Sequence, residues 1–197
     1  MWLLFLTGLC TMAMEIVWIR QYTVYLGNVV YSFAVILALY LGATCVGSSL
    51  YRFWVRSHDP RQSAGTWLFL GLLALLPLAF ADPALPVPRG LAWTLFRTAA
   101  GIVPISGALG FLTPLLVDHF SLGDPHRAGR AYAVNIIGAI IGPLLGGFLI
   151  LPWLGDHWGL VALSIPLFGI GLLTVVRKTP DVAVGRAVFG GGRFILW

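Results

Sequence analysis

The stretch TMAMEIVWIRQYTVYLGNVVYSFAVILAL, residues 11–39, joins two long apolar runs through Gly27 and Asn28. Glu15 and Arg20 are its only charged residues. A Gly-Asn pair favours a tight turn, and each apolar run exceeds the ~17 residues needed to cross the hydrocarbon core of a bilayer. The stretch therefore predicts a hairpin of two transmembrane helices, at 2–24 and 29–54.

The composition of the whole chain is that of a membrane protein. Of its 197 residues, 59% are hydrophobic and 10% are charged, and the mean hydropathy is +0.92. Soluble domains carry far more charge. Cys10 and Cys45 lie within apolar runs and lack the spacing of a redox or metal motif. We therefore expect an all-α integral membrane protein.

Four further apolar runs predict four more transmembrane helices, at 62–81, 91–117, 131–152 and 158–176. The proline-rich segment between the third and fourth helices cannot be helical throughout and is expected to form a loop. The runs divide the chain into a six-helix transmembrane domain, 1–176, and a short cytoplasmic tail, 177–197.

Basic residues between the predicted helices indicate the orientation in the membrane. If the N-terminus lies inside, the outer loops hold one basic residue, Arg89, and the inner segments hold Arg52, Arg56, Arg61, Arg127, Arg130, Arg177, Lys178, Arg186 and Arg193. Because Lys and Arg concentrate in cytoplasmic segments, we expect both termini in the cytoplasm, and a place in a bacterial inner membrane. Topology then explains the net charge of +5, and no nucleic-acid partner is expected.

Helix 131–152 has the clearest packing signal. NIIGAIIGPLLGGF, residues 135–148, places Gly138, Gly142 and Gly146 on one face at four-residue spacing, so that another helix can approach closely. Packing within the chain is the favoured interpretation, and a homodimer seam is the alternative. Asn135 is expected to form an inter-helix hydrogen bond. A partner for this face is suggested by the small residues of helix 29–54, which are Gly42, Ala43, Gly47, Ser48 and Ser49.

Helix 91–117 carries residues that disturb a helix, which are Gly101, Pro104, Gly107, Gly110 and Pro114. They predict a bend, either a simple kink or a broken helix that lines a cavity. Segments 31–47 and 132–147 both begin with tyrosine and carry glycines several turns later. They would be the second helices of two three-helix units with opposite orientation, an inverted repeat found in many transporters.

The charged residues within the predicted helices need partners or a role. Glu15 is deep in the first helix, and Arg20, about 140° further around that helix, is a poor partner that can extend toward the membrane surface. Arg97 matches Glu15 better in depth. A structural ion pair between Glu15 and Arg97 is favoured. A substrate or proton role, and a protonated, unpaired Glu15, are the alternatives.

Asp118, His119, Asp124 and His126 gather in the predicted inner loop 117–130. Their spacing matches no metal motif, so a solvated loop is favoured and no metal or other cofactor is expected. A nucleophile beside a base is also missing from the pattern, so we expect no catalytic residues and no enzyme activity.

Three segments resemble the membrane region of fused major facilitator superfamily/spermidine synthase-like proteins. In residues 8–56 the resemblance rests on Glu15, Trp18, Arg20, Gly27 and Tyr31. In residues 105–156 it rests on GFLTPLLVD and AGRAYAVNIIGAIIGPLLGGFLILPWLG, through Thr113, Pro114, Asp118, Gly129, Tyr132, Asn135, Gly138, Gly142, Pro152 and Gly155. Members of that family typically continue into an aminopropyltransferase-like domain, for which the tail 177–197 is too short. Its FGGG, 189–192, is not expected to bind a nucleotide.

Two classes of function fit these patterns. The favoured one is a non-catalytic membrane module that acts as an accessory or anchoring subunit of a larger assembly. The alternative is a small transporter or half-transporter, for a cationic metabolite such as a polyamine, in which Glu15 and the broken helix 91–117 line the path. The expected partners are the lipid bilayer and either another protein or a second copy of the chain.

Overall fold

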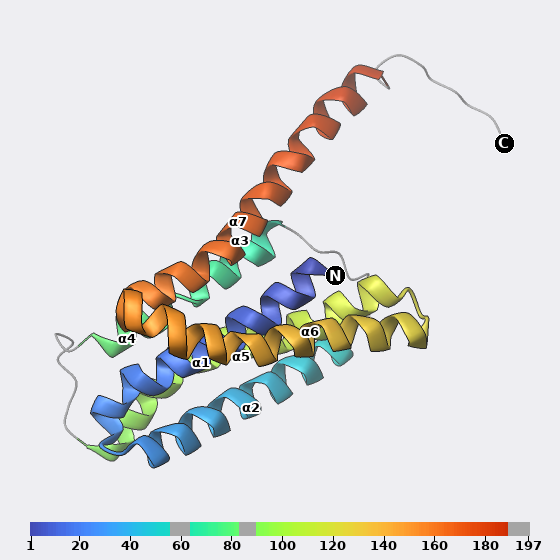
Figure 1. Cartoon of the computed structure of the whole chain (residues 1–197). Coiled ribbons are helices and arrows are strands. Elements are labelled where there is room, and N and C mark those ends of the chain that lie inside the picture. The colour runs from blue at the N-terminus through green and yellow to red at the C-terminus, as the bar shows by residue number, and fades with distance from the viewer. Residues whose placement is uncertain (56–63, 83–89, 189–197) are drawn as a thin grey trace.

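The computed structural model describes residues 1–55, 64–82 and 90–188, and every regular element in these ranges is helical (Figure 1). The elements are α1 (Trp2–Leu26), α2 (Val29–Trp54), α3 (Ala64–Leu73), α4 (Leu76–Ala81), α5 (Leu91–Ser121), α6 (Pro125–Leu145), the π-helical turn η1 (Gly146–Ile150) and α7 (Leu151–Val188). Within these described ranges, four helical runs are long and apolar enough to cross a membrane: Trp2–Leu26, Val29–Trp54, Leu91–Ser121 and Pro125–Ile170. The expected all-α membrane protein is confirmed at this level.

The predicted hairpin is present between α1 and α2. Gly27 ends α1 in the left-handed conformation, with φ of 77°, and its N–H donates to Thr23 O. The Asn28 side chain then accepts a hydrogen bond of 2.8 Å from Val30 N. Glycine tolerates the positive φ, and asparagine caps the next helix. The two residues therefore reverse the chain with no intervening loop.

The predicted single helix at 62–81 is wrong over the described residues. The chain forms two short helices instead, α3 and α4, with Pro77 in the first turn of α4. Proline lacks the N–H that would continue α3 and clashes with the preceding turn, so the helix restarts there.

The predicted helices 131–152 and 158–176 belong to one helical run, from α6 through η1 to α7. The run begins earlier than predicted, because Asp124 caps α6 and accepts a hydrogen bond of 2.9 Å from His126 N. It is broken at Gly155, where φ is 72° and ψ is −173°, and Figure 1 shows the chain reversing near this point. The helix continues past position 176 to Val188. The FGGG segment lies outside the described residues.

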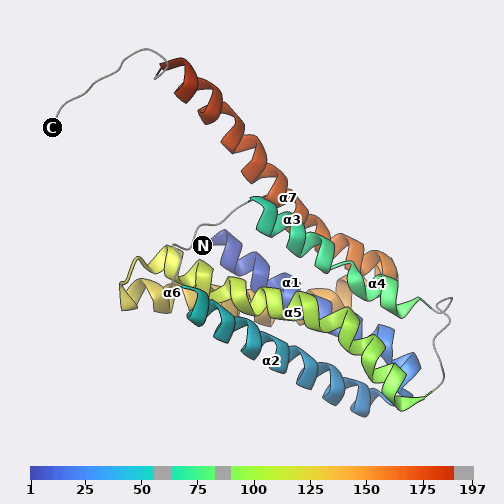
Figure 2. The ribbon, with the colours of Figure 1, turned by 180° about the vertical axis from the view of Figure 1, so that it is seen from behind.

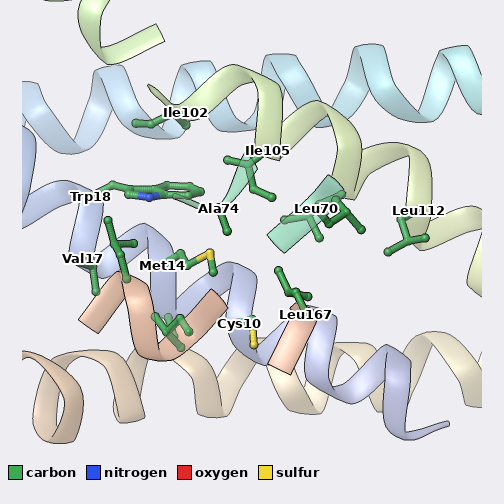
Figure 3. Close-up of a cluster of buried hydrophobic side chains, with 14 of the residues drawn as sticks. Cys10, Met14, Val17, Trp18, Leu70, Ala74, Ile102, Ile105, Leu112 and Leu167 are labelled. Atoms are coloured by element: carbon green, nitrogen blue, oxygen red, sulfur yellow. The ribbon is translucent and has the colours of Figure 1, made fainter. Parts of the chain in front are cut away.

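Helices α1 and α5 form the centre of the bundle (Figures 1 and 2). Helix α6 packs along α1, and α2 packs along α5. On another side of the centre, α3 packs on α7, α4 on α5, and α7 on α1. Trp18 lies in the buried core between these layers, beside Ile102 and Ile105 (Figure 3). Outside this core, polar side chains gather among α1, α2, α5 and α6.

The glycines of α6 lie against α1. A Cβ added at Gly138 or Gly142 would collide with the backbone oxygen of Phe5 or Leu9, and one at Gly146 would lie 3.0 Å from Ala13 O. Because both sets of residue numbers increase together, α1 and α6 run in the same direction. The suggested partner α2 is wrong: its Gly47 lies on Gly107 of α5 instead. These close approaches are contacts within the chain.

Candidate solute-binding groove

A cavity of about 620 Å³ lies among α1, α2, α5 and α6. It occupies the end of the bundle where α5 ends and α6 begins, called here the Asp118 end; the opposite end is the Gly27 end. Its polar lining residues are Thr11, Tyr40, Thr44, Ser48, Thr113, Asp118, Tyr132 and Asn135. Small-molecule sites span roughly 300–1,000 Å³. We call this cavity the polar groove.

Two close-packed helix pairs create the polar groove. Small residues bring α2 onto α5, where a Cβ added at Gly110 would lie 2.5 Å from Thr44 O. On the other pair, Asn135 of α6 donates a hydrogen bond of 2.8 Å to Leu4 O of α1. Helices α2 and α6 do not pack along each other. The space between the two pairs is therefore left open, and Asn135 both joins helices, as expected, and lines the groove.

Asp118 stands at the end of the groove. It belongs to the last turns of α5, which continues to Ser121, and it is exposed. Tyr51 Oη of α2 donates a hydrogen bond of 2.7 Å to Asp118 Oδ2. The predicted inner loop therefore starts later than expected, and Asp124 lies apart from Asp118, at the cap of α6. Among residues with described placement, no three acidic, His or Cys side chains gather as metal ligands would.

Glu15 is buried on α1, with 8% of its surface exposed. Across the described residues it has no hydrogen-bond or ion-pair partner, but it interacts electrostatically with Tyr40, a lining residue of the groove. Arg20 is exposed on α1, away from this position. Glu15 is therefore near the groove but outside its lining, and it lies closer to the membrane centre than the Asp118 end does.

The expected ion pair between Glu15 and Arg97 is wrong. Arg97 lies at the Gly27 end, where its guanidinium donates hydrogen bonds to the carbonyl oxygens of Phe80 and Asp82. It also lies 4.2 Å from the centre of the Tyr25 ring. The carbonyls at a helix C-terminus lack intrahelical donors and attract cations. The long arginine side chain therefore reaches the end of α4 instead of descending to Glu15.

Sequence reasoning overlooked the wall that α2 contributes. The lining residues Tyr40, Thr44 and Ser48 follow one another at intervals of four residues, and Tyr51, which donates to Asp118, follows three residues later. This spacing places them on one face of a helix. A polar stripe on an otherwise apolar membrane helix was the available signal.

Comparisons with models of protein families, with curated proteins and with solved structures found no match for this chain. The resemblance to the fused proteins stays an expectation, and function has to be inferred from the polar groove.

Proposed function

We propose that this protein moves a small solute across the membrane, as a half-transporter whose polar groove is one half of the pathway. The polar groove is the observation that carries the proposal. Several lining hydroxyls, such as those of Thr44 and Thr113, donate to carbonyl oxygens of their own helix. The hydroxyls of Tyr40 and Tyr132 and one carboxylate oxygen of Asp118 have no hydrogen-bond partner in the described structure. In hydrocarbon such groups would lose their hydrogen bonds to water at a cost of several kcal/mol each. A groove lined by such groups among membrane helices is stable where water or a polar solute fills it. The groove favours transport over the accessory role that the sequence favoured.

The packing of the helices supports two finer parts of the proposal, six membrane crossings and an inverted repeat. The first unit would hold α1, α2 and α3 with α4; the second would hold α5, α6 and α7 beyond Gly155. In this repeat α1 corresponds to α5, α2 to α6, and α3 with α4 to α7. The α1–α6 contact then corresponds to the α5–α2 contact, and the α1–α7 contact to the α5–α4 contact. The α3–α7 contact is unchanged by the exchange. This is the pattern of contacts that two related units produce.

The basic residues supply the proposed orientation. With both termini in the cytoplasm, the Asp118 end faces the cytoplasm and the groove opens inward. The Gly27 end, where Arg97 joins α4 and α5, faces outward. The structure would then be the inward-open state of the half-transporter.

A second copy of the chain is the proposed other half of the pathway. The polar grooves of the two copies would face each other, so that α2 of each copy contacts α6 of the other. Cys45 lies at the α2 edge of the groove and Ile136 is exposed on α6. In Ile136→Cys, oxidation in the membrane should yield a covalent dimer, and Leu172→Cys on α7 should not. Equal dimer yields from both variants would contradict this arrangement.

Efflux from proteoliposomes tests the transport function. Vesicles are loaded with a defined mixture of small polar metabolites, and mass spectrometry follows their loss. At least one solute should leave faster than from protein-free vesicles. Thr113→Trp, which fills the groove, should abolish the difference. Val103→Trp is the matched control, because Val103 lies on the same helix but faces a separate apolar pocket. Identical efflux with and without folded protein would contradict the proposal.

An accessory role is the second candidate, and one observation favours it. An apolar pocket of about 470 Å³ lies between α2 and α5, on a different face of α2 from the polar groove. Its Gly42 meets no other atom where a Cβ would stand, so another transmembrane helix could approach closely there. Gly42→Leu should then dissociate a co-purifying partner chain without lowering the melting temperature. Retention of that partner by Gly42→Leu would contradict the candidate.

A further inference from the structure

We propose that the solute is a small organic cation, an alkylammonium ion, and that the polar groove leads it from Asp118 to Glu15. The proposal rests on the transport function proposed above, for which it names the substrate class.

The charge of the groove selects for a cation. Asp118 is the one charged residue in its lining, and no Lys, Arg or His lines it within the part of the chain that the structure describes. Glu15 adds a second carboxyl group behind Tyr40. Low-dielectric walls carrying charge of one sign concentrate ions of the opposite sign. An anionic solute would meet the negative charge of Asp118 at the end of the groove.

The remaining lining selects an organic cation over a metal ion. The side chains of Tyr40 and Tyr132 provide aromatic rings, on which ammonium groups bind through cation–π attraction. Met12, Leu41, Leu109 and Val117 provide apolar surface for methylene groups. A divalent ion such as Ca²⁺ takes six to eight oxygen ligands, whereas Asp118 and Glu15 stand singly. The lining therefore matches a charged head with an apolar body.

The groove faces of α1 and α5 continue beyond the cavity to two unpartnered polar groups. Glu15 follows Gly8 by seven residues, and Ser106 precedes Thr113 by seven. Since seven residues make about two turns, each lies on the groove-lining face of its helix. Ser106 is fully buried, and its Oγ has no hydrogen-bond partner in the described structure. Glu15 has none either.

Both groups lie on the Asp118 side of the contact that α1 and α5 make at Tyr22 and Gly101. Gly101 of α5 packs on Tyr22 of α1. Glu15 lies about 10 Å before Tyr22, and Ser106 lies about 8 Å after Gly101 along the antiparallel helix, at ~1.5 Å per residue. A buried polar group without a partner is destabilising. Each of the two groups offers an oxygen that can accept a hydrogen bond from an ammonium group.

Binding to the full chain in lipid nanodiscs tests this inference. The probe is phenethylammonium, with phenylacetate and phenethyl alcohol as the anionic and neutral probes of similar size, and calorimetry measures affinity. Phenethylammonium should bind saturably, and at least tenfold more tightly than either of the others. Asp118→Asn and Glu15→Gln should each weaken its binding at least tenfold. Asp124→Asn, which neutralises a carboxylate at the cap of α6, should change it less than twofold.

The outcomes separate the substrate class from the transport function. Equal binding of phenylacetate, or unchanged phenethylammonium binding in both variants, overturns the organic-cation site. Circular dichroism and gel filtration establish that each variant is folded, and Ser106→Ala, which removes only the hydroxyl, gives a second measure: it should weaken binding severalfold. Specific binding without efflux of any solute would support the cation site and overturn the transport function. Efflux of only neutral or anionic solutes would support the transport function and overturn the cation site.

Discussion

Tyr51, near the end of α2, donates a 2.7 Å hydrogen bond to Asp118, near the end of α5. The two residues are 67 positions apart in the sequence, and their contact joins the two helices beside the mouth of the polar groove. Tyr51 is 2% exposed whereas Asp118 is exposed. The tyrosine thus holds one oxygen of the carboxylate and leaves the other available to a solute.

Tyr51→Phe should lower stability modestly. The change removes the hydrogen bond but keeps the ring, which packs edge-on against Phe111. A hydrogen bond to a partly solvated carboxylate contributes about 1 kcal/mol, which corresponds to a decrease in melting temperature of about 2–4 °C for a chain of this size. Tyr31→Phe, at the exposed start of α2, is the control and should shift it little. Equal shifts would show that the bond to Asp118 contributes nothing.

Gly142→Ala should destabilise the fold strongly, because its new Cβ would collide with Leu9 O and separate α6 from α1. We expect a loss of about 2 kcal/mol or more, as overpacking of a tight interface gives. Gly129→Ala is the matched control on the same helix, since no atom lies within 4 Å of its added Cβ. That control should be neutral or stabilising, because alanine favours helix over glycine. Thermal unfolding of both variants in detergent measures the difference.

Arg97 and Glu15 should behave as independent residues in a double-mutant cycle. Arg97→Gln should cost several kcal/mol, because it leaves carbonyl oxygens at the end of α4 without their donor. Arg97→Lys should recover only part of this loss, since an ammonium group lacks the planar fork of guanidinium. Adding Glu15→Gln should rescue nothing, with a coupling energy within about 0.5 kcal/mol of zero. A coupling energy above about 1 kcal/mol would instead show that Glu15 and Arg97 form an ion pair.

The features that could be predicted from the sequence are those that depend only on neighbouring residues. The Gly27–Asn28 turn and the close-packing face of α6 follow from backbone freedom and residue size, so both could be read from neighbouring positions. The interruption at Pro77 could also have been read, because proline inside a helix interrupts its hydrogen bonds. It was hidden by the apolar run around it.

The site could be predicted only in part, because it depends on which helices lie together. Arg97 binds carbonyl groups, which every residue carries, so no sequence pattern marks its partners. Asp118 was assigned to a loop because a charge commonly ends a membrane helix, whereas α5 continues for another turn beyond the apolar run. Glu15 was recognised as unusual, but its position behind Tyr40 required the packing of α1 and α2.

Cys45 offers a direct measure of water in the polar groove. Its side chain is exposed on the groove side of α2, whereas Cys10 is buried. The next residue, Val46, is also exposed but lines the apolar pocket on another face of the helix. A membrane-impermeant, positively charged thiosulfonate reacts with thiols that water reaches, because the reactive species is the thiolate. Cys45 should therefore react, and Val46→Cys in a Cys45→Ala background should not.

The side of reaction tests the orientation together with the groove. If the Asp118 end faces the cytoplasm, the reagent should modify Cys45 in inside-out vesicles much faster than in intact cells, since the Gly27 end is closed by Arg97 and Tyr25 around the end of α4. Faster reaction in intact cells would reverse the orientation and leave the groove in place. Equal reaction of Cys45 and Val46→Cys would instead mean that both faces of α2 meet the same solvent. The polar groove would then be no water-filled path, and the transport function would lose the observation that carries it.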